Sequence, residues 1–137
     1  MVVQQSGATP ALPKGMPNCL KKRQLLNDKV LSPDECRELG LKFLEMGWRE
    51  DALEFFQKGG MAAELDQLKA YCLETGDAFL MGHLGHQAPE DWRRLGERAL
   101  ALGKLHFARR AFEIAGDEDK TAMVAGLIAG EPTAADD

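Results

Sequence analysis

Long apolar runs are missing from this chain of 137 residues. No stretch approaches the roughly 18 consecutive apolar residues that a membrane-spanning helix needs, so we expect no membrane span. Residues 1–12 also lack a basic start followed by a continuous apolar stretch, which is the pattern of a secretory signal. The composition, 45% hydrophobic and 28% charged, is typical of a globular protein. From these observations we expect a cytoplasmic location.

Cysteines are few and widely spaced, which favours reduced thiols over a disulfide framework. Cys72 precedes His83 and His86, and zinc accepts thiolate and imidazole ligands. A structural zinc site needs four ligands, however, and the sequence offers no second compact pair of them. The phosphate-loop pattern Gly-x-x-x-x-Gly-Lys and the nucleophile pattern Gly-x-Ser-x-Gly are missing as well. We therefore expect no metal, no cofactor and no catalytic residue, and the prediction is a protein that is not an enzyme.

A net positive charge is found only in the first part of the chain. Residues 1–32 carry a net charge of +4, which leaves −9 for the rest of a chain whose total is −5. An acidic body repels a phosphate backbone, so we do not expect nucleic acid as a partner. The Lys-Lys-Arg run at 21–23 is either a solvated helix face or a contact with a phosphate backbone or an acidic protein surface.

Two stretches of the chain, residues 36–59 and 92–115, share one spaced pattern at an offset of 56 residues. The first has Cys36, Leu39, Gly40, Phe43, Gly47, Ala52, Phe56 and Gly59, and the second has Trp92, Leu95, Gly96, Ala99, Gly103, Ala108, Phe112 and Ala115. Each stretch predicts two antiparallel helices joined by a glycine turn. A glycine inside a helix costs about 1 kcal/mol relative to alanine, so Gly40 and Gly96 indicate a close contact between the two helices. Because 56 is twice 28, a third and degenerate copy should lie between them.

Capping residues and glycines mark where the helices begin and end. Ser32-Pro33-Asp34-Glu35 combines a capping serine, a first-turn proline and a capping-box glutamate, and Pro89 opens the third copy in the same way. Gly47 permits the left-handed residue that ends a helix. The predicted helices are 18–27, 33–46, 49–58, 62–74, 78–87 and 118–129, with another pair after Pro89.

The repeat predicts an all-α fold, a right-handed α-solenoid of about three antiparallel helix pairs plus a C-terminal capping helix. One pair has too little core to fold alone, and stacking makes the core continuous. The predicted segments are a disordered tail (1–17), a short N-terminal helix or cap (18–31), the repeat domain (32–130) and an acidic disordered tail (131–137).

This pattern resembles the tetratricopeptide repeat family in a shortened form. Its signature, W-x2-L-G-x2-Y followed by A-x3-F, is met by Trp92, Leu95, Gly96, Ala108 and Phe112, with Ala99 in the aromatic place. The first copy has Leu39, Gly40, Phe43, Ala52 and Phe56, with Cys36 in the tryptophan place. The resemblance covers residues 33–116, and its period is 28 residues where the family has 34.

The resemblance implies a non-catalytic protein-protein interaction module, either an adaptor or a chaperone-like holder of a peptide. In that family the first helices of the pairs line a concave groove. Carried over by position, the groove residues are Arg37, Leu41, Leu44, Asp66, Lys69, Leu73, Arg93, Glu97 and Leu100. The two matching arginines either grip an acidic segment of the partner or pair with nearby Glu and Asp.

A self-assembling structural or scaffold component is the alternative function. Exposed ends of a solenoid favour stacking, so a homo-oligomer would form through those ends. The short helix at 18–27 either covers the N-terminal end of the stack or binds a partner.

Overall fold

The computed structural model describes residues 17–27 and 30–130, which form eight helices and no strand. The predicted tails at 1–17 and 131–137 lie outside the described residues, apart from Pro17. None of the helices in this part of the chain is long and apolar enough to cross a membrane. In chain order the helices are α1 (Cys19–Asn27), α2 (Pro33–Glu45), α3 (Arg49–Gly59), α4 (Ala62–Thr75), α5 (Ala78–His83), α6 (Pro89–Ala101), α7 (Leu105–Ala115) and α8 (Glu118–Ile128).

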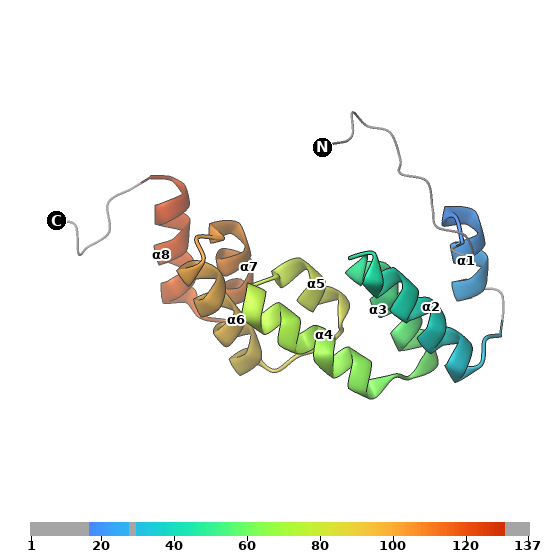
Figure 1. The fold of residues 1–137 in the computed structure, drawn as a ribbon. Coiled ribbons are helices and arrows are strands. Elements are labelled where there is room, and N and C mark those ends of the chain that lie inside the picture. Colours follow the sequence, from blue (N-terminus) through green and yellow to red (C-terminus); the bar gives the residue numbers. More distant parts are fainter. Residues whose placement is uncertain (1–16, 28–29, 131–137) are drawn as a thin grey trace, which may run out of the picture.

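The helices follow one another along an elongated row, with α1 at one end and α8 at the other (Figure 1). The closest packing is within α2–α3 and α6–α7, and α8 packs against α7. Contacts of α4 with α3 and with α6 join the first pair to the third. The all-α prediction is therefore confirmed.

A glycine in the middle of the first helix allows each of the two close pairs to form. A Cβ atom at Gly96 would lie 2.7 Å from Cε1 of Phe112, and Gly40 faces the ring of Phe56 in the same way. Both rings are fully buried, so a side chain at either glycine would force a ring out of its place. The close contact predicted at these two glycines is confirmed.

The predicted caps and turns are also present. The backbone N–H of Glu35 donates to Oγ of Ser32 (3.1 Å), and the backbone N–H of Ser32 donates to Oε1 of Glu35 (2.9 Å). These two bonds form the capping box at the start of α2. The turn glycines Gly47 and Gly103 have φ of +80° and +76°, a region in which side chains are strained.

The prediction for the second helix of the middle pair is wrong at its end. The spacing predicts that helix over 78–87, and α5 ends at His83. Gly85 follows with φ of +94°, and a left-handed glycine at this point ends a helix. The other predicted boundaries agree with the structure to within one residue.

The core runs through the row and holds two of the three cysteines. Cys36 and Cys72 are fully buried, whereas Cys19 is exposed. Burial raises the pKa of both buried thiols, and together with the nearby Asp77 carboxylate it brings the pKa of Cys72 to about 12. Thiols in such surroundings stay protonated and inert at neutral pH.

Candidate functional site

The residues predicted to line a groove lie on α2, α4 and α6, and we call this set the first-helix face. Its members are Arg37, Leu41 and Leu44 on α2, Asp66, Lys69 and Leu73 on α4, and Arg93, Glu97 and Leu100 on α6. Leu41 is 44% exposed. The other three leucines are half-buried, with Leu44 and Leu73 packed against the main core and Leu100 against the cluster near α8.

The three cations on this face each pair with an acid at the start of the helix two places further along the row. Nε of Arg37 lies 3.3 Å from Oε2 of Glu64, and Nε of Arg93 lies 3.6 Å from Oδ2 of Asp117. Between them, Nζ of Lys69 lies 2.9 Å from Oδ2 of Asp91. We call these three pairs the ion-pair ladder, since they join α2 to α4, α4 to α6, and α6 to α8.

Each acid of the ladder lies at the start of its helix. Glu64 and Asp91 are in the first turns of α4 and α6, and Asp117 is the N-cap of α8. Carboxylates at these places are stabilised by the positive end of the helix dipole, and they can accept hydrogen bonds from the unpaired N–H groups of the first turn. Each cation of the ladder therefore pairs with an acid that also stabilises the N-terminus of the helix that it begins.

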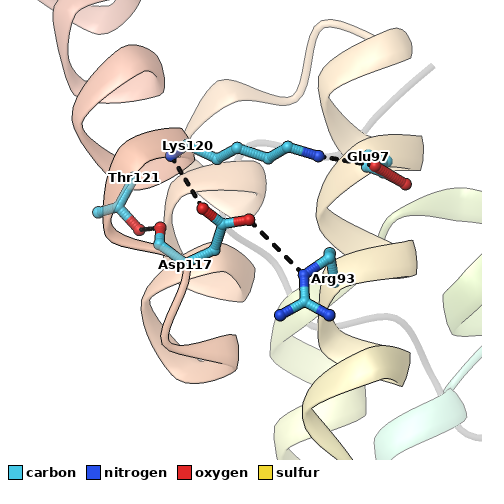
Figure 2. Close-up of polar contacts among 5 residues, drawn as sticks. All are labelled: Arg93, Glu97, Asp117, Lys120 and Thr121. Atoms are coloured by element: carbon cyan, nitrogen blue, oxygen red, sulfur yellow. Dashed lines mark hydrogen bonds and ion pairs between the residues drawn. The ribbon is translucent and has the colours of Figure 1, made fainter.

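Figure 2 shows the last link of the ladder, where one aspartate serves two helices. The carboxylate of Asp117 accepts from the backbone N–H of Lys120 (3.1 Å) while its other oxygen faces Arg93. The hydroxyl of Thr121 donates to the Asp117 carbonyl (2.7 Å). Nζ of Lys120 reaches back to Oε2 of Glu97 at 2.8 Å, so two ion pairs of opposite direction join α6 and α8.

The two matching arginines are thus in ion pairs with neighbouring acids, one of the two roles left open for them. Both remain accessible, with 47% of the Arg37 side chain and 41% of the Arg93 side chain exposed. An exposed pair of this kind contributes about 0.2–1 kcal/mol. An acidic ligand would have to exchange with Glu64 and Asp117 to reach them.

A second site, which the sequence reasoning missed, lies beneath α1. A cleft of about 940 Å³ separates α1 from the α2–α3 pair. Phe43, Trp48 and Leu26 supply apolar lining, and Asp51 and Glu54 supply acids. Leu26 belongs to α1 itself, so we call the side of this cleft that faces α1, formed by Phe43, Trp48, Asp51 and Glu54, the α1 seat. The one available signal was the acidic pair of α3, spaced to face the basic run at 21–23.

The α1 seat owes its apolar floor to stacked aromatic rings. The ring centroids of Phe43 and Trp48 are 5.8 Å apart, and those of Phe43 and Phe55 are 5.6 Å apart. Both pairs are stacked, which adds about 0.5–1.5 kcal/mol per pair to their burial. The ring of Phe43 in the floor of the seat thus stacks on two neighbours, Trp48 and Phe55.

A smaller cleft of about 510 Å³ lies between the α2–α3 turn and α5. Trp48, Tyr71 and Phe79 line it, and the Arg49 guanidinium sits 4.0 Å from the Tyr71 ring centroid. That cation already occupies the face of Tyr71.

The residues weighed as zinc ligands do not come together as a site. Cys72 is fully buried, whereas His83 and His86 are exposed. Nδ1 of His83 lies 2.9 Å from the Phe79 carbonyl oxygen, and its ring packs on the Phe79 ring. Within residues 17–27 and 30–130, no group of three or more His, Cys, Asp or Glu side chains is arranged to hold a metal ion.

Comparison with known proteins adds no assignment. No family model, no curated protein and no solved structure matches this chain.

Proposed function

We propose that the chain is a non-catalytic protein-protein interaction module that holds an extended segment of a partner along its first-helix face. In this proposal the helix pairs form a right-handed, tetratricopeptide-like solenoid whose concave side is that face. The ion-pair ladder carries the proposal, because its side-chain pairs link α2 to α4, α4 to α6 and α6 to α8. A surface repeated over successive helices suits a ligand that is itself extended.

Apolar contacts carry recognition in this proposal, and charge sets orientation. Leu41, Leu73 and Leu100 give one accessible or half-buried leucine on each of the three helices. The arginines already form ion pairs in the ladder. An acidic partner segment must therefore replace Glu64 or Asp117, and its net gain in binding free energy is only the difference between the new ion pair and the old one. Partners with leucine-sized side chains at regular spacing fit this face best.

Site-specific crosslinking tests the assignment of the face. A photoreactive residue is placed at Leu41 or Leu100 in the full chain, and at Ile114 as a control. Ile114 is 44% exposed, as Leu41 is, but it lies on α7, a second helix. We expect Leu41 and Leu100 to crosslink to the same protein and Ile114 not to. Equal capture from all three positions would sink the assignment.

The captured protein is then purified, and its affinity for the wild type and for variants of this chain is measured. The double variant Leu41→Asp, Leu100→Asp should lose at least tenfold in affinity, because it puts two charges into an apolar contact. Ile114→Asp is the matched control and should bind as the wild type does. Arg37→Glu with Arg93→Glu should change affinity for an acidic partner segment and leave an apolar one unaffected.

A further inference from the structure

Helix α1 is attached to the rest of the molecule mainly by polar contacts. Leu25 is its one buried residue and belongs to the main core cluster, and α1 contacts α3. Nζ of Lys22 pairs with the carboxylates of Asp51 and Glu54, the latter at 2.7 Å. Burial by itself would lower the pKa of Lys22, but these two acids hold it above its ordinary value. Nζ of Lys58 donates to the Leu26 carbonyl at 2.8 Å.

These contacts are of the two kinds that join the repeated helices to each other. Lys22 meets Asp51 in the first turn of α3, as Arg37 meets Glu64 in the first turn of α4. Lys58 holds a carbonyl at the end of α1, as Lys104 holds the Thr75 carbonyl (2.5 Å) at the end of α4. Helix α1 is thus held at its cation Lys22 and at the Leu26 carbonyl near its C-terminal end.

The residues that the structure describes fill the apolar part of the α1 seat incompletely. The cleft of about 940 Å³ remains open with α1 in place, over the rings of Phe43 and Trp48. Leu26 reaches it from α1, whereas Leu20 on the same helix is 66% exposed. A helix whose leucines faced the floor would bury more apolar surface than α1 does.

We propose that the α1 seat is a docking site for a basic helix of another protein, which binds in place of α1. The acids of the seat and the net charge of −9 outside the basic arm favour a cationic ligand. The floor requires leucine-sized residues on the same side as the cation, and α1 is the intramolecular, weaker occupant. None of the seat residues belongs to the first-helix face, so this inference goes beyond the proposed function and does not depend on it.

A fluorescein-labelled peptide with the sequence of residues 18–27, with serine in place of Cys19, is the probe. It is titrated by anisotropy against the full chain and against Lys22→Glu. That substitution sets a third negative charge beside Asp51 and Glu54, so it releases α1 and frees the seat. We expect Lys22→Glu to bind the peptide at least tenfold more tightly than the wild type, with affinity falling as salt rises. Equal affinity for both chains would overturn the proposal.

Charge reversal supplies the matched control. Adding Asp51→Lys and Glu54→Lys to Lys22→Glu restores opposite charges between α1 and α3, so the triple variant should not bind the peptide. A peptide with glutamate at the place of Lys22 should bind the Asp51→Lys, Glu54→Lys chain instead. Retained binding of the original peptide by the triple variant would place the peptide outside the seat and contradict the proposal.

Two further measurements distinguish this proposal from binding at the first-helix face and from self-association through α1. Adding Leu41→Asp and Leu100→Asp to Lys22→Glu should leave peptide binding unchanged, because those leucines lie outside the seat. A wild-type chain that is dimeric by light scattering, and monomeric as Lys22→Glu, would assign the seat to α1 of a second copy and overturn the proposal.

Discussion

The α2–α3 and α6–α7 pairs share a framework but differ on one side. Both have a glycine against a buried phenylalanine. At three other equivalent positions the first pair has large aromatic residues where the third has smaller or flexible ones. These equivalent residues are Phe43, Trp48 and Phe55 in the first pair, and Ala99, Lys104 and Ala111 in the third.

What precedes each pair accounts for the difference. The α6 helix packs against α4, and the turn glycine Gly76 comes so close to it that a Cβ there would lie 2.7 Å from Cα of Ala99. Only small residues fit between two helix pairs at that distance. The first pair is preceded by the single helix α1, and Phe43 fills the wider space. At position 99 the small residue accompanies the close approach of Gly76, whereas the equivalent position 43 has a large ring.

Exchanging the residues should have its largest effect in the third pair. Ala99→Phe puts a ring where the Gly76 backbone lies, and we expect it to destabilise the protein by at least about 3 kcal/mol. Urea unfolding followed by circular dichroism measures the change. Ala101→Phe, on the same helix but exposed, is the control and should cost under about 0.5 kcal/mol. Similar values for the two variants would refute the size argument.

The turn glycines provide the next test. Gly76 and Gly103 have φ of +70° and +76°, but only at Gly76 would an added Cβ atom meet neighbouring atoms within 4 Å. Gly103→Ala should cost about 1 kcal/mol from the left-handed backbone alone. Gly76→Ala adds the clash with Ala99, so we expect at least about 2 kcal/mol. Equal losses in thermal or urea unfolding would mean that the close approach has no energetic weight.

Alkaline pH should lower the free energy of unfolding, because the buried thiols ionise more readily once the chain unfolds. Burial raises the folded-state pKa of Cys72 to about 12, above its ordinary value of 9.0. Stability from this group is complete below pH 9 and is lost as pH rises toward 12, because the unfolded thiol ionises first. At pH 10 the loss is about 1 kcal/mol relative to pH 8. Urea unfolding of the wild type and Cys72→Ala at both pH values should show a smaller pH-dependent loss in the variant. The same loss in both would assign the effect elsewhere.

The smallest effect is expected for the ion-pair ladder. A double-mutant cycle with Arg93→Ala and Asp117→Ala should give a coupling energy of about 0.2–1 kcal/mol that shrinks in high salt. Asp117→Ala alone should cost more than Arg93→Ala, because it also removes the N-cap of α8. A coupling that does not respond to salt would exclude an ion pair as its source.

Local features of the fold could be predicted from the sequence. Ser32 with Glu35 marks the start of α2, and Gly47 marks its turn, because caps and left-handed residues depend on a few neighbouring residues. Gly40 and Gly96 indicate a close contact because a mid-helix glycine has a cost that only packing offsets. The predicted end of α5 is too late, since the left-handed conformation of Gly85 is not visible in the helical spacing around it.

The partners of the charged residues could not be predicted. Arg37 finds its acid 27 residues later, Lys69 finds its acid 22 later, and Arg93 finds its acid 24 later. These intervals differ because the middle copy is irregular, so periodicity alone does not identify the pairs. The α1 seat was missed for a related reason: it depends on how a helix outside the repeat lies against α3.

The ion-pair ladder gives the row a polarity. In each of its three links the earlier helix supplies the cation and the later helix the acid, and the pair of Lys22 with Asp51, outside the ladder, has the same sense. This order of charges is directional. Two copies of the row could extend it only head to tail, because a head-to-head contact would bring like charges together. At α8 the sense reverses, because its single basic residue, Lys120, points back to Glu97. Because Lys120 is engaged with Glu97, α8 has no basic residue left to pair with an acid on a further helix, and the series of ion pairs ends at α8.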